Sequence, residues 1–273
     1  MAGPAKGALR GLPNEEIWNY HVPVWPRHER ALAQFMISDE PASIMRMAHR
    51  CLPSSGEIDQ IIIRVDDRST SMKSKASAIV RAESDLLNAL LATRKPESLL
   101  WQCHVNDQVR LLHPRRGAVR LEEMALPQLQ DFKIGQGLIS GSCISDGYRF
   151  AAALACSHAS RGIAIPIKIA VTTDGENMHP SVDSNYALAM EWRDRSERRA
   201  ARWIETARRF GNIHFAHFGF VREKDGSWEA HDRFRRSMGI RPEEDHLIFV
   251  KPGDSFDRSV GVTSRLTSDF ISY

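Results

Sequence analysis

The amino-acid sequence predicts an α/β fold with a doubly wound, mostly parallel central sheet, one antiparallel edge strand and helices on both faces. The first observation is a β-branched run from Ile61 to Val65, of the kind that fills a strand buried on both faces. The second is that further strand-length apolar runs alternate with helical patterns, which implies crossover connections and parallel pairing. Predicted strands cover 163–171, 213–220 and 246–250, and predicted helices cover 73–93, 146–158, 186–210, 229–238 and 255–270.

The antiparallel edge is predicted from two strands, 98–105 and 108–113, which are separated only by Asn106-Asp107. A two-residue polar connection between strands is typical of a β-hairpin. Within the strand at 163–171, Pro166 predicts a bulge or an exposed end, because proline has no N–H to donate to the ladder.

The chain divides at a break formed by Pro53-Ser54-Ser55-Gly56, directly before the first predicted strand. Residues 1–57 form an N-terminal extension, with an irregular arm up to about residue 26 followed by short helices at 28–37 and 42–52. Residues 58–273 form the α/β domain. A length of 273 residues is sufficient for one large domain with such an extension.

Composition excludes several classes of protein. With 42% hydrophobic and 26% charged residues, the chain has the composition of an ordinary globular protein, and a net charge of +3 is too mild to indicate nucleic-acid binding. The N-terminal residues lack the apolar core of a signal peptide, and no apolar run approaches the ~20 residues needed to span a bilayer. The four cysteines form no C-x-x-C pair, so we expect reduced thiols in a cytoplasmic protein without membrane association.

Three polar clusters follow elements that a doubly wound sheet brings to one edge. They are Asp67-Arg68-Ser69-Thr70-Ser71 after the first strand, Gly141-Ser142 before the helix at 146–158, and Thr173-Asp174-Gly175 after the strand at 163–171. Loops at the carboxyl ends of parallel strands are where such sheets bind ligands. Carboxylate and hydroxyl oxygens are hard ligands, which favour Mg²⁺ or Mn²⁺ over softer metals.

The order and spacing of these clusters resemble the metal-ion-dependent adhesion site (MIDAS) of von Willebrand factor A (vWA) domains, in particular bacterial intracellular members. The resemblance covers about residues 58–273. It implies that Ser69 and Ser71 bind the ion through their hydroxyls, with Ser142 where the family usually has threonine, and that Asp67 and Asp174 act largely through bound waters. Thr70 departs from the family pattern, which usually has glycine there.

The function that this resemblance implies is divalent-cation-dependent protein binding, in which Mg²⁺ bridges to an Asp or Glu of a protein partner. Neutral hydroxyl ligands leave the ion electrophilic, so that it accepts a carboxylate from outside the domain. The resemblance also implies a setting beside an AAA-type ATPase or in a stress or defence system. It implies no enzymatic activity.

Simpler roles exist for the same residues. Asp67, Ser69, Ser71 and Ser142 are residue types that cap helices and form turns, and Asp174-Gly175 is a common turn after a strand. Strand alternation points Asp66 away from Asp67. Asp146 and Glu176 are close enough in sequence to support the site from behind its ligands, but a helix-capping or solvated role is the preferred interpretation of both. His214 and His217 are interpreted as packed or exposed residues rather than metal ligands.

Two alternative functions use other features of the chain. The first is a metal-dependent hydrolase that uses the same oxygens, although the sequence contains no P-loop, H-E-x-x-H or G-x-S-x-G motif. The second is nucleic-acid association through the arginine-rich helix at 193–209. That helix also carries acidic residues at i, i+4 spacing, which favours a solvated, charge-paired face instead.

Overall fold

The computed structural model describes the core elements of the fold. It covers residues 27–51, 58–69, 84, 87–88, 91–92, 97–106, 108–113, 115–123, 142–173, 177, 186–222, 227–250 and 269–270. The arm at 1–26, most of the predicted helices at 73–93 and 255–270, and two site residues, Ser71 and Asp174, lie outside these ranges.

The described chain alternates strands and helices as predicted. The strands are β1 (Gln60–Asp67), β2 (Ser98–Val105), β3 (Val109–Leu111), β4 (Ala118–Arg120), β5 (Ile167–Thr173), β6 (Ile213–Arg222) and β7 (Asp245–Val250). The helices are α2 (Arg27–Ser38), α3 (Pro41–Cys51), α5 (Ile144–Ala159), α6 (Tyr186–Ala207) and α7 (Ser227–Met238), with short 3-10 turns at Leu121–Glu123 and Pro242–Glu244.

The sheet has the order β3-β2-β1-β5-β6-β7, with β4 also paired to β2. The pairs β1–β2, β1–β5, β5–β6 and β6–β7 are parallel, which confirms the predicted fold class. The antiparallel edge is made by two short strands, because β3 pairs with residues 103–105 of β2 and β4 with residues 99–101. The chain order reverses direction at β1, so the carboxyl ends of β1 and β5 lie at the topological switch point of the sheet, where open α/β sheets bind ligands.

The predicted strand at 163–171 begins later than expected. Pro166 precedes β5 instead of interrupting it, and its carbonyl accepts a hydrogen bond of 2.9 Å from the N–H of Ile61. Proline therefore precedes the strand at a place where its missing N–H costs no ladder bond. Of the two predicted alternatives, the bulge is wrong and the exposed end is confirmed, because Pro166 is exposed.

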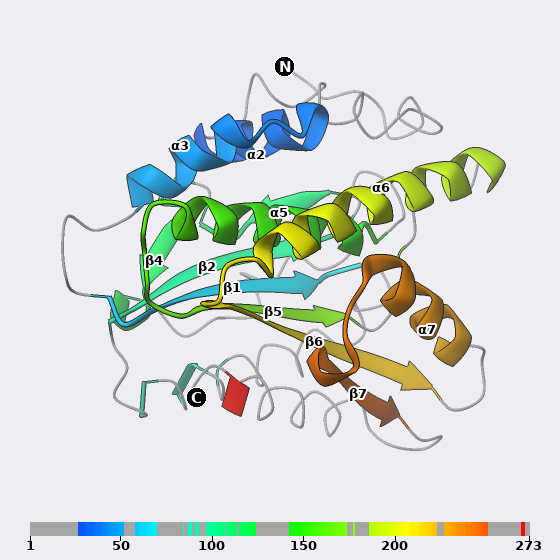
Figure 1. The fold of residues 1–273 in the computed structure, drawn as a ribbon. Coiled ribbons are helices and arrows are strands. Elements are labelled where there is room, and N and C mark those ends of the chain that lie inside the picture. The colour runs from blue at the N-terminus through cyan, green and yellow to red at the C-terminus, as the bar shows by residue number, and fades with distance from the viewer. Residues whose placement is uncertain are drawn as a thin grey trace, which may run out of the picture.

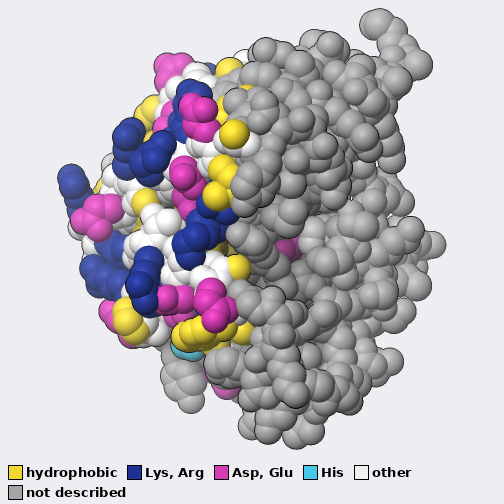
Figure 2. Space-filling model, turned by 90° about the vertical axis from the view of Figure 1, so that its right-hand side faces the viewer, with side chains coloured by type: hydrophobic (Ala, Val, Ile, Leu, Met, Phe, Trp, Pro, Cys, Tyr) yellow, Lys and Arg dark blue, Asp and Glu magenta, His cyan; other side chains and the backbone are white. Residues whose placement is uncertain are grey.

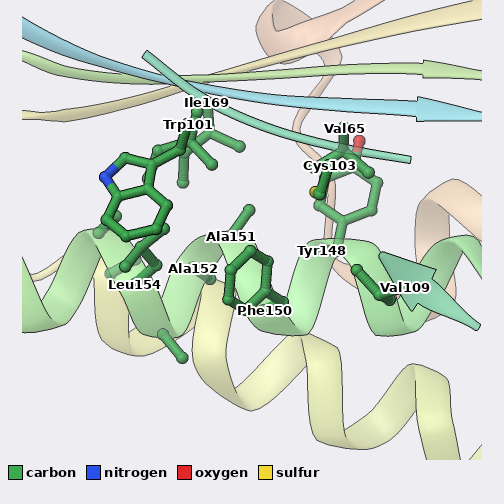
Figure 3. Close-up of a cluster of buried hydrophobic side chains, with 14 of the residues drawn as sticks. Val65, Trp101, Cys103, Val109, Tyr148, Phe150, Ala151, Ala152, Leu154 and Ile169 are labelled. Carbon is green, nitrogen blue, oxygen red and sulfur yellow. The ribbon is translucent and has the colours of Figure 1, made fainter. Parts of the chain in front are cut away.

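Two layers of apolar contacts hold the sheet. Figure 1 shows the helices α2, α3, α5 and α6 above one face, with α5 next to the strands. Figure 3 shows side chains of α5, including Tyr148, Phe150 and Leu154, together with Trp101 and Cys103 of β2 in this core. On the opposite face, Ile62 packs with Leu87 and with the partly buried Phe270.

The helices of the N-terminal extension contribute to the same core. Phe35 packs edge-on against Trp203 of α6 with ring centroids 5.6 Å apart. Arg149 of α5 donates a 2.9 Å hydrogen bond to the carbonyl of Met36, and Trp203 donates one of 3.1 Å to Asp39. Residues 27–51 are thus packed against the α/β domain, while the boundary at residue 58 stays a prediction.

Gly147 allows α5 to approach the sheet closely. A Cβ atom at this position would lie 2.6 Å from Cγ1 of Val65 and 2.7 Å from Cγ2 of Val105. We expect Gly147→Ala to lower the free energy of unfolding by about 1–3 kcal/mol through overpacking, measured by urea denaturation. The control is Gly211→Ala, where a Cβ would meet no atom within 4 Å. Equal stability of the two variants would contradict this close approach.

His158 makes stability depend on pH. Its Nε2 accepts a 3.1 Å hydrogen bond from the indole of Trp101, and burial lowers the pKa of His158 from 6.5 to about 3. The unfolded chain therefore binds a proton below pH 6.5 that the folded state refuses, and stability falls as the pH falls. Between pH 6.5 and 5 this histidine should cost about 2 kcal/mol, measured by urea denaturation at each pH.

The matched variants are His158→Gln, which keeps an acceptor for Trp101, and His214→Gln on the exposed side of β6. Of these two variants, only His158→Gln should make the free energy of unfolding fall less steeply as the pH falls. An unchanged slope in this variant would show that another group is responsible.

Candidate metal centre at the carboxyl edge of the sheet

Asp67 is the last residue of β1 and lies at the switch point between β1 and β5. Its side chain is buried, with 3% of the residue exposed. A carboxylate removed from water in this way is stable only when hydrogen-bond donors or a cation compensate its charge. The groups around Asp67 therefore show what this position is built to hold.

Three hydrogen bonds bring separate segments of the chain to the Asp67 carboxylate. The backbone N–H of Ser69 donates to Oδ1 at 2.9 Å. The hydroxyls of Ser142 and Thr173 both donate to Oδ2, at 3.0 and 2.7 Å. The end of β1, the segment before α5 and the end of β5 thus meet at one side chain, as the predicted convergence of loops requires.

Local structure explains why Asp67 and Ser142 face each other. Alternation along β1 directs Asp66 to the other face, where its Oδ1 forms a 2.8 Å ion pair with Arg64. Ser142 does not cap α5: the N-cap residue is Cys143, which makes no side-chain capping bond. Instead the N–H of Cys143 donates to the carbonyl of Asn106 at 2.8 Å, which ties this segment to the end of β2.

The structure thus brings together three of the five predicted site residues, Asp67, Ser69 and Ser142. Ser71 and Asp174 lie outside the described residues, so their part in the site stays a prediction. Sequence reasoning overlooked Thr173, which belongs to the third polar cluster but was treated as the residue before Asp174. Its position as the last residue of β5, beside the end of β1, was the available signal.

The donor set fits a hard divalent cation. Ser142 and Thr173 both donate their hydroxyl protons to Asp67, which places two neutral oxygen atoms beside the carboxylate. Hydroxyl oxygens of this kind are possible ligands of a metal ion. Mg²⁺ prefers several neutral oxygens and few direct carboxylates, which matches these side chains. If Mg²⁺ binds there, Asp67 would balance its charge while the hydroxyls supply ligands.

A polar layer behind the site fixes the start of α5. Asp146 is buried, accepts a 2.8 Å hydrogen bond from Ser196 of α6 and lies 3.5 Å from the guanidinium of Arg149. The sequence interpretation of Asp146 as a capping or solvated residue is therefore wrong. The reason is tertiary: α6 covers the first turn of α5, and the neighbouring arginine compensates the buried charge.

Asn177 connects the end of the β5 segment to the same layer. Its side-chain oxygen accepts hydrogen bonds of 3.2 Å from both the N–H and the hydroxyl of Ser145, and its Nδ2 donates to Glu197 at 2.9 Å. Thr173 and Asn177, which flank residues 174–176, are thus both bound to the site or its support. This is the arrangement that a ligand at Asp174 would need.

A second group of metal-ligand types lies elsewhere on the sheet. Three residues each offer one ligand atom, and these atoms lie within 4.8 Å of one another. The residues are His217 of β6, His231 of α7 and Asp245 of β7. Spacing along the sequence gave no sign of this group, because each residue comes from a different element.

Comparisons with known proteins identify the fold. No protein-family model matches the chain, and no curated protein matches its sequence. Among solved structures, the vWF domain of the type V pili tip protein Mfa5 from Porphyromonas gingivalis superposes with a TM-score of 0.51, at 7% identity, over 80% of this chain and 96% of that one. The fold is von Willebrand factor A-like.

Two further pilus proteins share this vWA-like fold with the chain. A D319A mutant of the PilB minor pilin from Streptococcus sanguinis matches with a TM-score of 0.52, at 12% identity over 81% of this chain. The pilus adhesin SpaC from Lactobacillus rhamnosus GG matches with a TM-score of 0.50, at 11% identity over 81% of this chain. The matches span 63% of PilB and 30% of SpaC. Among the described helices of the vWA-like chain, none combines the length and apolarity needed to cross a membrane.

The Asp67 carboxylate should contribute to the stability of the folded chain even without a metal. Asp67→Asn keeps one acceptor oxygen but places an N–H₂ group among three donors, so we expect the free energy of unfolding in EDTA to fall by about 1.5–3 kcal/mol. Urea denaturation measures this, with Asp59→Asn, an exposed carboxylate just before β1, as the control. Wild-type stability of Asp67→Asn would show that the three hydrogen bonds do not hold the site.

Proposed function

We propose that this vWA-like domain is a divalent-cation-dependent protein-interaction module. Mg²⁺ or Mn²⁺ is held by Asp67, Ser69, Ser71, Ser142 and Asp174, and it bridges to an Asp or Glu of a protein partner. The observation that carries the proposal is the Asp67 carboxylate, which receives hydroxyl protons from two other segments and so gathers neutral oxygen atoms at one point.

The ligand chemistry explains why the partner must be acidic. Serine and threonine hydroxyls are neutral, so they reduce the charge of the ion less than carboxylates do. The ion then gains most from a further anionic oxygen, and a carboxylate of the partner would supply one at the switch point of the sheet. Such a contact is strong only while the metal is present, so removal of the metal should release the partner.

The fold neighbours support a role in protein interaction. They are a pilus tip protein, a minor pilin and a pilus adhesin. An AAA-type ATPase as partner, and a stress or defence system as setting, follow from the resemblance of the motif alone. The four free cysteines are typical of a reducing compartment and support a cytoplasmic location.

The arginine-rich helix favours no second function. In α6, Arg193 lies 3.4 Å from Asp194 and 3.9 Å from Glu197. Arg208, directly after the end of α6, forms a 2.5 Å ion pair with Glu244. Figure 2 shows Lys and Arg side chains interspersed with Asp and Glu over the described part of this side of the molecule. This is a charge-paired surface, unlike the single-sign patch of a nucleic-acid site.

The hydrolase alternative is tested by measuring phosphoester turnover with and without Mg²⁺.

Cation binding is tested by thermal unfolding of the full chain with added Mg²⁺ and Mn²⁺. An ion at 100 times its dissociation constant should stabilise the wild type by about 2.7 kcal/mol. The double variant Asp67→Ala/Ser69→Ala should lose this gain, and Ser142→Ala should weaken it. Ser157→Ala is the control, because its hydroxyl donates to the Ala153 carbonyl within α5. The same gain in all four proteins would place the cation elsewhere.

Metal bridging is tested with partners captured by the wild-type chain in Mg²⁺. Bound proteins should elute in EDTA and be absent from captures with Asp67→Ala/Ser69→Ala. Substitution of one Asp or Glu of an identified partner by Asn or Gln should then abolish binding. A partner that stays bound in EDTA and to the double variant would contradict the bridge.

A further inference from the structure

A compact group of imidazole and carboxylate side chains lies between β6, β7 and α7, apart from the Asp67 site. His217 and Asp245 are direct neighbours across the β6–β7 pair, and His231 of α7 lies above them. His217 is 1% exposed, and the side chains of His231 and Asp245 are 9% and 7% exposed. Such polar groups are costly to bury unless each has a partner.

Two atoms of this group have no hydrogen-bond partner among the described residues. They are Nε2 of His217 and Oδ1 of Asp245, and both are buried. The other atoms of the same side chains are well satisfied: His217 Nδ1 shares a 2.5 Å hydrogen bond with the Tyr148 hydroxyl, and Asp245 Oδ2 lies 3.1 Å from His231 Nε2. Unpartnered atoms in an otherwise satisfied cluster indicate a missing ligand.

Gly219 keeps the space between the two rings open. A Cβ atom there would lie 3.2 Å from His217 Nε2, 3.2 Å from His231 Nδ1 and 2.9 Å from His231 Cε1. A ring nitrogen of each histidine therefore faces the same side of β6, and any side chain at position 219 would fill the gap. Glycine at this position leaves the space beside both rings open to a ligand.

The second nitrogen of the His217 ring is held by a polar group, because its Nδ1 shares a hydrogen bond with the Tyr148 hydroxyl. Metal-binding histidines usually have this support, which fixes the tautomer and turns the free lone pair toward the ion. Burial also lowers the pKa of His217 to about 3, so its imidazole is neutral and able to coordinate.

We propose that His217, His231 and Asp245 bind a transition-metal ion of the Zn²⁺ class. His217 Nε2, His231 Nε2, which lies 3.1 Å from Asp245 Oδ2, and the Asp245 carboxylate supply three ligands, and a fourth position is left for water or an external group. Imidazole nitrogens favour Zn²⁺ over Mg²⁺, so this site and the oxygen site at Asp67 select different ions. The metal would tie α7 to β6 and β7.

The charges around the group are compatible with a cation. Arg235 Nε lies 3.7 Å from Asp245 Oδ2, but the same guanidinium forms a 2.9 Å ion pair with Asp232. Trp228, which is 45% exposed, stacks on His231 with ring centroids 6.3 Å apart, so the group lies close to the surface.

The test uses the full chain, freed of metal by chelation and then titrated with Zn²⁺ or Co²⁺. We expect one tightly bound Zn²⁺ per chain, a rise in the unfolding temperature, and the visible absorption of four-coordinate Co²⁺. His231→Gln and Asp245→Asn should each weaken Zn²⁺ binding about 10–100-fold or more. Both residues lie at the edge of the cluster, so these variants are expected to fold.

The matched controls are His214→Gln, an exposed histidine on the same strand, and Asp67→Asn at the oxygen site. Both should bind Zn²⁺ as the wild type does, and circular dichroism should confirm that every variant is folded. Stoichiometric Zn²⁺ that persists in His231→Gln and Asp245→Asn would overturn the proposal. Failure of the wild type to bind Zn²⁺ more tightly than Mg²⁺ would do the same.

Discussion

The buried carboxylate of Asp67 is the constraint around which the site of this domain is organised. Asp67 is the last residue of the hydrophobic strand β1, so its charge lies at the point where the order of the sheet reverses. An uncompensated carboxylate in that position would destabilise the fold, so the segments before α5 and after β5 must bring donors to it. The hydrogen bonds from Ser142 and Thr173 satisfy that requirement and create a cluster of oxygens. Stability and cation chemistry thus depend on the same contacts.

The remainder of the core holds those segments in position. Gly147 lets α5 lie directly on Val65 and Val105, which fixes the height of the helix above the carboxyl ends of β1 and β2. Behind it, Asp146 and Arg149 form a buried ion pair that α6 covers. A shift of α5 would therefore disturb the apolar core, this polar layer and the Ser142 hydrogen bond together. Because these contacts all depend on the position of α5, we expect the site to form and to unfold as one unit.

Local chemistry was sufficient to predict most of the framework. The β-branched run of β1, the helical periodicity of α6 and the order of polar clusters gave the fold class and the convergence on Asp67. The start of β5 was predicted wrongly because Pro166 can either interrupt a strand or precede one, and only the pairing with Ile61 distinguishes the two. The three-residue strand β4 was too short to have a pattern of its own.

Contacts between elements that are far apart in the chain could not be predicted from the sequence. Thr173 contributes to the site because β5 lies beside β1, and Asp146 is buried because α6 packs over it. The group formed by His217, His231 and Asp245 is the clearest case, since three elements contribute one residue each. Motif spacing detects ligands that share a loop or a helix face, and it misses ligands that are brought together only by strand pairing and helix packing.

The central claim is that Asp67 gathers three segments into one cation site. Nuclear magnetic resonance with substoichiometric Mn²⁺ tests it most directly, because a paramagnetic ion broadens the signals of nearby amides. The account predicts simultaneous broadening at Ser69, Cys143 and Thr173, which excess Mg²⁺ reverses and Asp67→Asn abolishes. Broadening confined to one of these segments, or found only around His217 and His231, would contradict it.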